Sequence, residues 1–142
     1  MKRVLFVFTI VAAMALTLAS CAETIVKLSK NLDGTWSATS YTVDGVEILG
    51  DSSFITGVTL AFMDEGDGMG DVTITLNSIF GSDAATGTYE VLSENDVDQL
   101  VITTVEDSTT DVVTMNMDLD GKDLTLTFTE DGETAIIQAA KQ

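Results

Sequence analysis

The stretch 111-DVVTMNMDLDGKDLTLTFT-129 decides the fold of this chain. Residues of two sets alternate in both of its halves: one set is apolar throughout, and the other is polar except for Val112. The apolar set is Val113, Met115, Met117, Leu119, Leu124, Leu126 and Phe128. A period of two is typical of β-strands with one buried face and one solvated face. Asp120-Gly121 lies between the halves, and such a pair favours the tight turn of a β-hairpin. The stretch therefore predicts two adjacent antiparallel strands.

The rest of the chain repeats this pattern. Asp44-Gly45 and Asp131-Gly132 are further hairpin signals, and no proline interrupts the alternating segments. Short connections favour antiparallel pairing between neighbours in the sequence. We predict eight strands, at residues 34–43, 57–64, 69–77, 85–92, 98–105, 111–119, 122–129 and 133–140.

The expected fold is all-β, an eight-stranded antiparallel up-and-down barrel. Closure of the sheet removes the exposed edges through which strands aggregate. A barrel of eight strands has room inside for side chains or for one small ligand. The identity of the inward face depends on register, because a one-residue slip reverses every side chain.

The first twenty residues have the composition of an export signal. Lys2 and Arg3 are followed by the apolar run from Val4 to Leu18. A charged start and a short apolar core are typical of signal peptides. The run is about 15 residues long, below the ~20 residues that an α-helix needs to span a bilayer. We therefore expect a cleaved signal and not a permanent transmembrane helix.

The end of this run matches the bacterial lipoprotein processing box, Leu18-Ala19-Ser20-Cys21. Small residues admit the peptidase beside the bond it cuts, and the thiol of Cys21 accepts the diacylglycerol. Cys21 is the only cysteine of the chain, so no intramolecular disulfide is expected. Several acyl chains on one residue would give stable membrane attachment. We predict cleavage after Ser20 and lipidation of Cys21.

The predicted organisation has three parts: a lipoprotein signal peptide at 1–20, the lipidated Cys21 and a tether at 21–32 with one helical turn, and a barrel domain at 33–142. Ala22 is not the aspartate that retains some lipoproteins at the inner membrane. The resemblance to that sorting rule implies the outer membrane of a cell envelope, with the periplasmic face or the outer surface both open.

Charge excludes several classes of function. After removal of residues 1–20, four basic residues remain against 23 acidic ones, a net charge of −19. Such a surface repels phosphate backbones, so we expect no nucleic-acid partner. The chain has no histidine, and Cys21 is assigned to lipid. Ser-His and Cys-His nucleophiles are therefore excluded, and we predict no catalytic residue, no metal ligand and no cofactor.

The segment Leu32-Asp33-Gly34-Thr35-Trp36 resembles the start of a lipocalin-type barrel. In that superfamily a Gly-x-Trp opens the first strand after a short helical turn. The resemblance implies that Gly34 permits the tight entry and that the Trp36 ring closes one end of the barrel.

Beyond this segment, the chain resembles the small lipocalin-like lipoproteins of bacteria with two membranes over most of residues 28–140. Gly87-Thr88-Tyr89 and Leu124-Thr125-Leu126-Thr127 carry this resemblance together with Trp36. Two departures are evident. The late arginine that stacks on the tryptophan is missing, with Lys141 as its substitute, and the Thr-Asp-Tyr motif of larger lipocalins is absent.

The candidate ligand-binding residues are apolar or aromatic residues on predicted inward faces: Tyr89, Met115, Met117, Leu126 and Phe128. Methionine adapts to irregular cavities, although ordinary barrel packing would use the same residues. The acids Asp64, Glu65, Asp67 and Asp71 invite a calcium interpretation, but their spacing does not fit an EF-hand loop. Solvated hairpin loops explain them better.

Three functions follow from the sequence. The first is a membrane-anchored barrel that binds a small hydrophobic or amphipathic ligand. The second is a structural lipoprotein whose filled barrel contacts another envelope protein. The third, a hydrolase with paired carboxylates, would need two acids that converge in a pocket.

Overall fold

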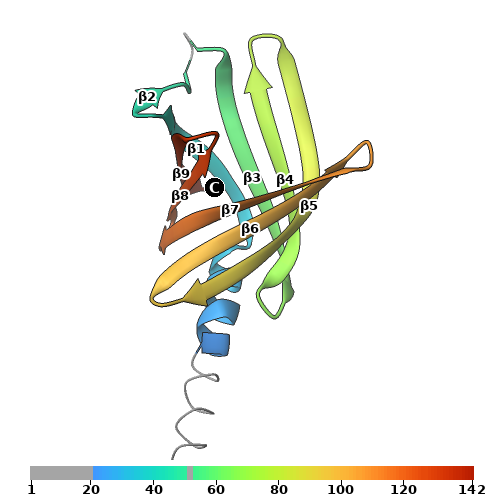
Figure 1. Cartoon of the computed structure of the whole chain (residues 1–142), viewed down its shortest axis with the longest axis vertical. Helices are drawn as coiled ribbons and strands as arrows, with labels where there is room; N and C mark the ends of the chain where they lie inside the picture. The colour runs from blue at the N-terminus through green and yellow to red at the C-terminus, as the bar shows by residue number, and fades with distance from the viewer. Residues whose placement is uncertain (1–20, 51–52) are drawn as a thin grey trace, which may run out of the picture.

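The computed structural model describes residues 21–50 and 53–142 (Figure 1). The predicted signal peptide at 1–20, which includes the cleavage residues Leu18, Ala19 and Ser20, lies outside the described residues. In the described part, no helix is both long enough and apolar enough to cross a bilayer.

All eight predicted strands are present. The strands are β1 (Gly34–Val43), β2 (Val46–Glu47), β3 (Ile55–Gly66), β4 (Met69–Ser78), β5 (Gly81–Glu94), β6 (Val97–Glu106), β7 (Thr109–Asp120), β8 (Asp123–Glu130) and β9 (Glu133–Lys141). Only the two-residue β2 was not predicted. It is held to β1 by the pairs Thr42↔Glu47 and Val43↔Val46.

The strands form one closed antiparallel sheet. Its order is β2-β1-β3-β4-β5-β6-β7-β8-β9, and β1 also pairs with β9. The predicted up-and-down barrel is therefore confirmed, with β2 as an appendage. Because β1 and β9 close the ring within residues 34–141, the barrel needs no strand from residues 1–20 for its closure.

The hairpin turns use residues that tolerate positive φ. The φ values are 48° at Asp44 and 78° at Gly45 in one turn, and 50° at Asp131 and 87° at Gly132 in another. Type I′ turns require positive φ at both central residues. Asn95-Asp96 and Asp107-Ser108 adopt the same pattern without glycine, which is why the sequence did not mark them as turns.

The inward faces are those that the alternation predicted. Met115, Met117, Leu124 and Leu126 are buried, and their polar neighbours on β7 face solvent. The pairs Leu100↔Met115 and Met117↔Leu126 continue this face across three strands. The inside of the barrel is therefore one apolar core, to which all eight long strands contribute.

A helix covers one end of the barrel, and here the prediction of a single turn was wrong. Residues 21–32 are helical throughout. Leu32 and Ser29 are fully buried, and Ile25 and Leu28 pack against the core. These four positions lie at i, i+3, i+4 and i+7, which is one face of a helix. Tertiary packing of this face stabilises a helix that is too short to be stable alone.

The two ends of the barrel differ. The helix, the β3–β4 turn and the β5–β6 turn lie at one end, which we call the closed end (Figure 1). The β4–β5 and β8–β9 turns lie at the other, the open end. Towards the open end the β4–β5 and β6–β7 hairpins diverge, because the pairing of β5 with β6 begins only at Gly87↔Thr104. The described residues Gly81–Thr86 therefore pair with β4 alone.

Candidate ligand-binding site

Trp36 joins the helix to the barrel. Its ring is completely buried, and its Nε1–H donates a 2.7 Å hydrogen bond to the carbonyl of Leu32. The last carbonyls of a helix lack partners within the helix, so this bond completes the end of residues 21–32. Gly34 enters β1 at φ 117°, a conformation that favours glycine. The resemblance implied that Gly34 and Trp36 close the barrel, and both lie at its closed end.

Lys141 occupies the place expected of the missing arginine. Its Nζ lies 5.4 Å from the centroid of the Trp36 ring and donates a 2.8 Å hydrogen bond to the carbonyl of Asn31. A cation at this distance from an aromatic face is attracted by the ring. The same ammonium group therefore covers the tryptophan and caps the helix, whose C-terminus carries partial negative charge.

A polar cluster fastens the helix to the strands. The Ser29 hydroxyl donates to Oδ1 of Asp64 and lies 3.1 Å from the Tyr89 hydroxyl. The Tyr89 ring packs edge-on against Phe62, with the centroids 5.3 Å apart. Burial raises the pKa of Tyr89 above its usual 10.0, against a smaller lowering effect of the Ser29 hydroxyl. This cluster satisfies the buried serine and keeps the tyrosine protonated.

An apolar cavity of about 220 Å³ lies inside the barrel on the open-end side of this closure. It is lined by Tyr41, Val58, Leu60, Ile74, Leu76, Ile102, Thr104, Val113, Met115, Leu126, Phe128 and Ile137. All twelve occupy inward positions on seven strands, and none carries a formal charge. The cavity is therefore a product of the closed sheet, and no single segment of the sequence forms it.

Three of the five candidate binding residues line this cavity: Met115, Leu126 and Phe128. The other two do not. Tyr89 lies in the polar cluster under the helix, and Met117 is buried one inward position closer to the closed end of β7. Alternation identifies the inward face correctly, but it does not give the level of a residue along the barrel axis.

Tyr41 is a lining residue that the sequence analysis missed. Neither the Tyr41 hydroxyl nor the Thr104 hydroxyl has a hydrogen-bond partner among the described residues. Neither oxygen is fully buried, so neither is an unsatisfied buried group. Burial, and then the charge of Glu130, raises the pKa of Tyr41 above its usual 10.0. Tyr41 belongs to a strand with a bulge between Ala38 and Ser40, and this bulge hides its inward orientation from a strict period of two.

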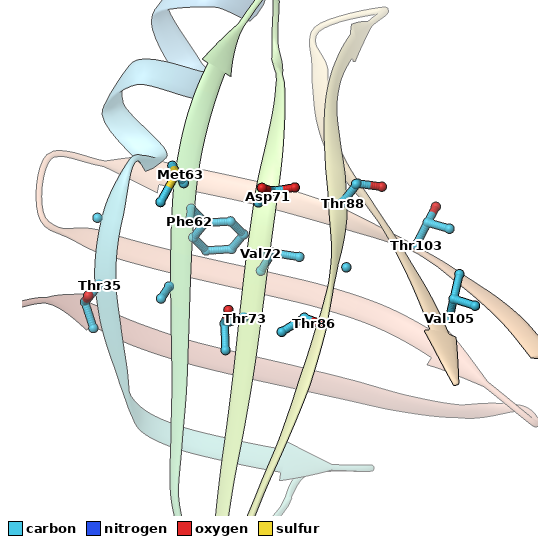
Figure 2. Close-up of a pocket in the computed structure, with 13 residues that line it drawn as sticks. Thr35, Phe62, Met63, Asp71, Val72, Thr73, Thr86, Thr88, Thr103 and Val105 are labelled. Carbon is cyan, nitrogen blue, oxygen red and sulfur yellow. The ribbon is translucent and has the colours of Figure 1, made fainter. Parts of the chain in front are cut away.

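A second hollow lies on the outer face of the barrel (Figure 2). Its volume is about 750 Å³, and its floor is a row of small side chains that are paired across four strands, Thr35, Ala61, Thr73 and Thr86. Met63 and Asp71 lie beside this row. The groove is open and rich in hydroxyl groups, so it offers a ligand less apolar contact than the interior.

The acidic loops form no evident ion site in the described part of the chain. No three carboxylates or thiols there converge on a position that would hold a metal. Oδ1 of Asp64 instead accepts hydrogen bonds from the Ser29 hydroxyl and from the N–H of Gly66. The Asp33 carboxylate accepts the N–H of Asp64. These acids therefore organise the β3–β4 turn beneath the helix.

No protein-family model matches the sequence, and no curated protein matches it. Among solved structures, a redesigned β-barrel is 17% identical and has a TM-score of 0.55, with 80% of this chain and 94% of that one covered. Fatty-acid-binding protein 1 of Echinococcus granulosus is 14% identical, with a TM-score of 0.45 and coverage of 79% and 98%. The described chain is a closed antiparallel all-β barrel with one additional short strand and one short helix, and it shares the barrel fold with the redesigned protein.

Proposed function

We propose that this chain is a lipid-anchored protein of the cell envelope whose barrel binds a small apolar molecule, and that it is not an enzyme. The apolar cavity of about 220 Å³ carries this proposal. Protein interiors are packed as densely as organic crystals, and large voids are few. A cavity of this size costs stability when it is empty, and a ligand that fills it recovers the lost contacts.

The lining favours an apolar occupant. Ten of its twelve residues are apolar without a hydroxyl group, and a cavity of such composition holds hydrocarbon better than water. Burial of apolar surface contributes about 25 cal/mol per Å². The lining residues lie on the parts of the strands away from the helix, so a ligand that enters from the open end does not disturb the Trp36 closure.

The position of Cys21 supports the anchor. Cys21 is exposed and begins the described helix, which lies below the closed end (Figure 1). Acyl chains on this cysteine would hold the closed end towards the membrane and direct the open end away from it. We propose the outer membrane as the site of attachment, from Ala22 and the processing box at 18–21.

A pair of adjacent substitutions tests the cavity. Val113 lines it, whereas Val112 is 60% exposed on the outer face of the same strand. Each chain is purified gently from its own host, supplied with a total lipid extract and examined by native mass spectrometry. The wild type and Val112→Phe are expected to retain one apolar molecule per chain, and Val113→Phe is expected to lose it. A wild type without ligand, or equal occupancy in both variants, contradicts the proposal.

The anchor has a separate test. Growth with an alkyne-labelled fatty acid is expected to label the wild type and Glu23→Gln, and to leave Cys21→Ser unlabelled and unprocessed. Glu23 is the matched control because it is an exposed neighbour on the same helix. Label retained in Cys21→Ser would show that the lipid is attached to another residue, and it would contradict lipidation through the processing box.

One observation favours a second candidate function, contact with an envelope protein. Phe54 and Phe80 are 70% and 83% exposed, with ring centroids 6.1 Å apart beside the open end. Exposed aromatic clusters mark interaction sites in many proteins. If the barrel acts by such contact, the double variant Phe54→Ser, Phe80→Ser loses a cross-linked partner in cells while Val113→Phe keeps it.

A further inference from the structure

We propose that the barrel selects an uncharged molecule of about nine heavy atoms with one hydrogen-bonding group, and that it excludes carboxylates of the same size. The inference rests on the proposed function and names the ligand class. Its size follows from proportion, since an apolar cavity of about 150 Å³ accommodates benzene and this one measures about 220 Å³.

No cation of the described residues lies at the cavity to pair with a bound carboxylate. The lining has no lysine or arginine. The four lysines of the described chain all lie at the closed end: Lys27 and Lys30 on the helix, Lys122 in the β7–β8 turn, and Lys141 over Trp36. A carboxylate inside the cavity would lose its hydration without gaining a partner, which is costly in an apolar environment.

The rim of the open end carries only negative charge among the described residues. Its acids are Asp44, Glu47, Asp83, Glu106, Asp107, Asp111, Glu130, Asp131 and Glu133. Glu130 is the one whose position matters most. It continues the inward alternation of Leu126 and Phe128 on β8, and its charge acts on the phenol of Tyr41. An anionic head group left at the rim would therefore meet Glu130, and like charges in contact are strongly disfavoured.

An uncharged polar group has partners in the same place. Tyr41 and Thr104 are the two lining residues that carry a hydroxyl group, and no described residue bonds to either hydroxyl. A hydroxyl can both donate and accept, so either group can bind an alcohol, an aldehyde or a ketone from its own side of the ring. The apolar remainder of the ligand then faces Met115, Leu126 and Ile137.

The matched probes are 1-octanol and octanoate, which share one chain and differ in charge. Calorimetric titration uses the mature chain from residue 21 with Cys21→Ser, whose barrel closes through β1 and β9. We expect saturable binding of 1-octanol at one site, and binding of octanoate at least about tenfold weaker at pH 7.5, because of like-charge repulsion and lost hydration.

Charge reversal at the rim sharpens the test. Glu130→Lys is expected to strengthen octanoate binding by about tenfold or more and to change 1-octanol binding by less than about twofold. Glu90→Lys is the control, because this substitution makes the same change in net charge and Glu90 is exposed on the outward face of β5. Circular dichroism verifies that both variants are folded.

The outcomes separate the two proposals. Equal binding of octanol and octanoate to the wild type overturns the selectivity and leaves the binding function intact. An equal gain for octanoate in Glu130→Lys and Glu90→Lys also overturns it, because the effect would then come from net charge and not from the rim. Failure of both probes, and of branched and cyclic alcohols of similar size, contradicts the binding function itself.

Discussion

At the scale of single residues, polar atoms on aromatic side chains decide how the closed end is built. The indole N–H of Trp36 and the ammonium group of Lys141 reach the carbonyls of Leu32 and Asn31. Tyr89 reaches Ser29 in the same way. The contacts of Trp36 and Tyr89 let an apolar ring fill the core while its polar tip satisfies a group of the helix. Phenylalanine in place of Trp36 or Tyr89 would fill space without the bond.

Trp36→Phe tests this arrangement. The variant keeps an aromatic ring but leaves the Leu32 carbonyl without its donor and opens a small void, so we expect it to lower the free energy of unfolding by about 2 kcal/mol. Urea denaturation measures the change. Val112→Phe, on the outer face, serves as the control and is expected to alter stability by less than about 0.5 kcal/mol. An equally stable Trp36→Phe chain would show that the indole N–H does not matter.

At the scale of elements, the strands were predictable and the helix was not. Residues 111–129 show a clear period of two between turn signals. This pattern predicts strands whenever one face of the sheet is buried, whatever covers that face. Residues 21–32 span about three turns, and isolated helices of that length are marginal. Ile25, Leu28, Ser29 and Leu32 do form one face, but a buried serine obscured it because its partners, Asp64 and Tyr89, are far away in the sequence.

The contact of the helix with the β3–β4 turn gives a prediction. A Cβ atom on Gly68 would lie 2.2 Å from Cγ2 of Ile25, so Gly68→Ala must displace the helix or the turn. We expect faster hydrogen exchange in residues 21–32 and a loss of stability of about 1–3 kcal/mol. Gly121→Ala is the control, because a Cβ there meets nothing within 4 Å and its φ of 60° is also positive. Similar exchange in the two variants would contradict close packing at Gly68.

The raised pKa values of the two tyrosines give a prediction of how the stability of the folded chain depends on pH. Folding raises the pKa of Tyr41 and of Tyr89, so the unfolded chain loses these protons first as the pH rises. Their contribution is therefore complete below about pH 10 and is lost as the pH passes through the folded values. We expect Tm to fall between about pH 10 and pH 12, and to fall less in the double variant Tyr41→Phe, Tyr89→Phe. These are the two tyrosines of the chain, so an unchanged slope would contradict the assignment.

At the scale of the whole molecule, closure of the barrel creates the cavity and separates two ends of different character. The closed end carries Trp36, the helix and all four described lysines, and the open end carries acids beside an apolar interior. Alternation in the sequence predicted that Met115, Leu126 and Phe128 face inward. It could not predict that space remains between them, because the volume inside depends on all twelve lining side chains at once. Tyr89 and Met117 were placed with them because alternation lacks information on depth.

One methionine is expected to respond to an interior ligand, and the others are not. Met115 lines the cavity, Met117 is buried outside it, and Met63 is 64% exposed beside the outer groove. Selective ¹³C labelling of methionine methyl groups therefore reports on the three places in one spectrum, with Met115→Leu and Met63→Leu variants for assignment.

The most direct measurement is a titration of this labelled chain, from residue 21 with Cys21→Ser, with 1-octanol. We expect a saturable shift of the Met115 methyl resonance at a stoichiometry of one, with little change at Met63. A shift at Met63 without one at Met115 would transfer binding to the outer groove. If no methionine resonance shifts up to the solubility limit of the alcohol, the cavity does not bind a ligand of this class and the proposed binding function is wrong.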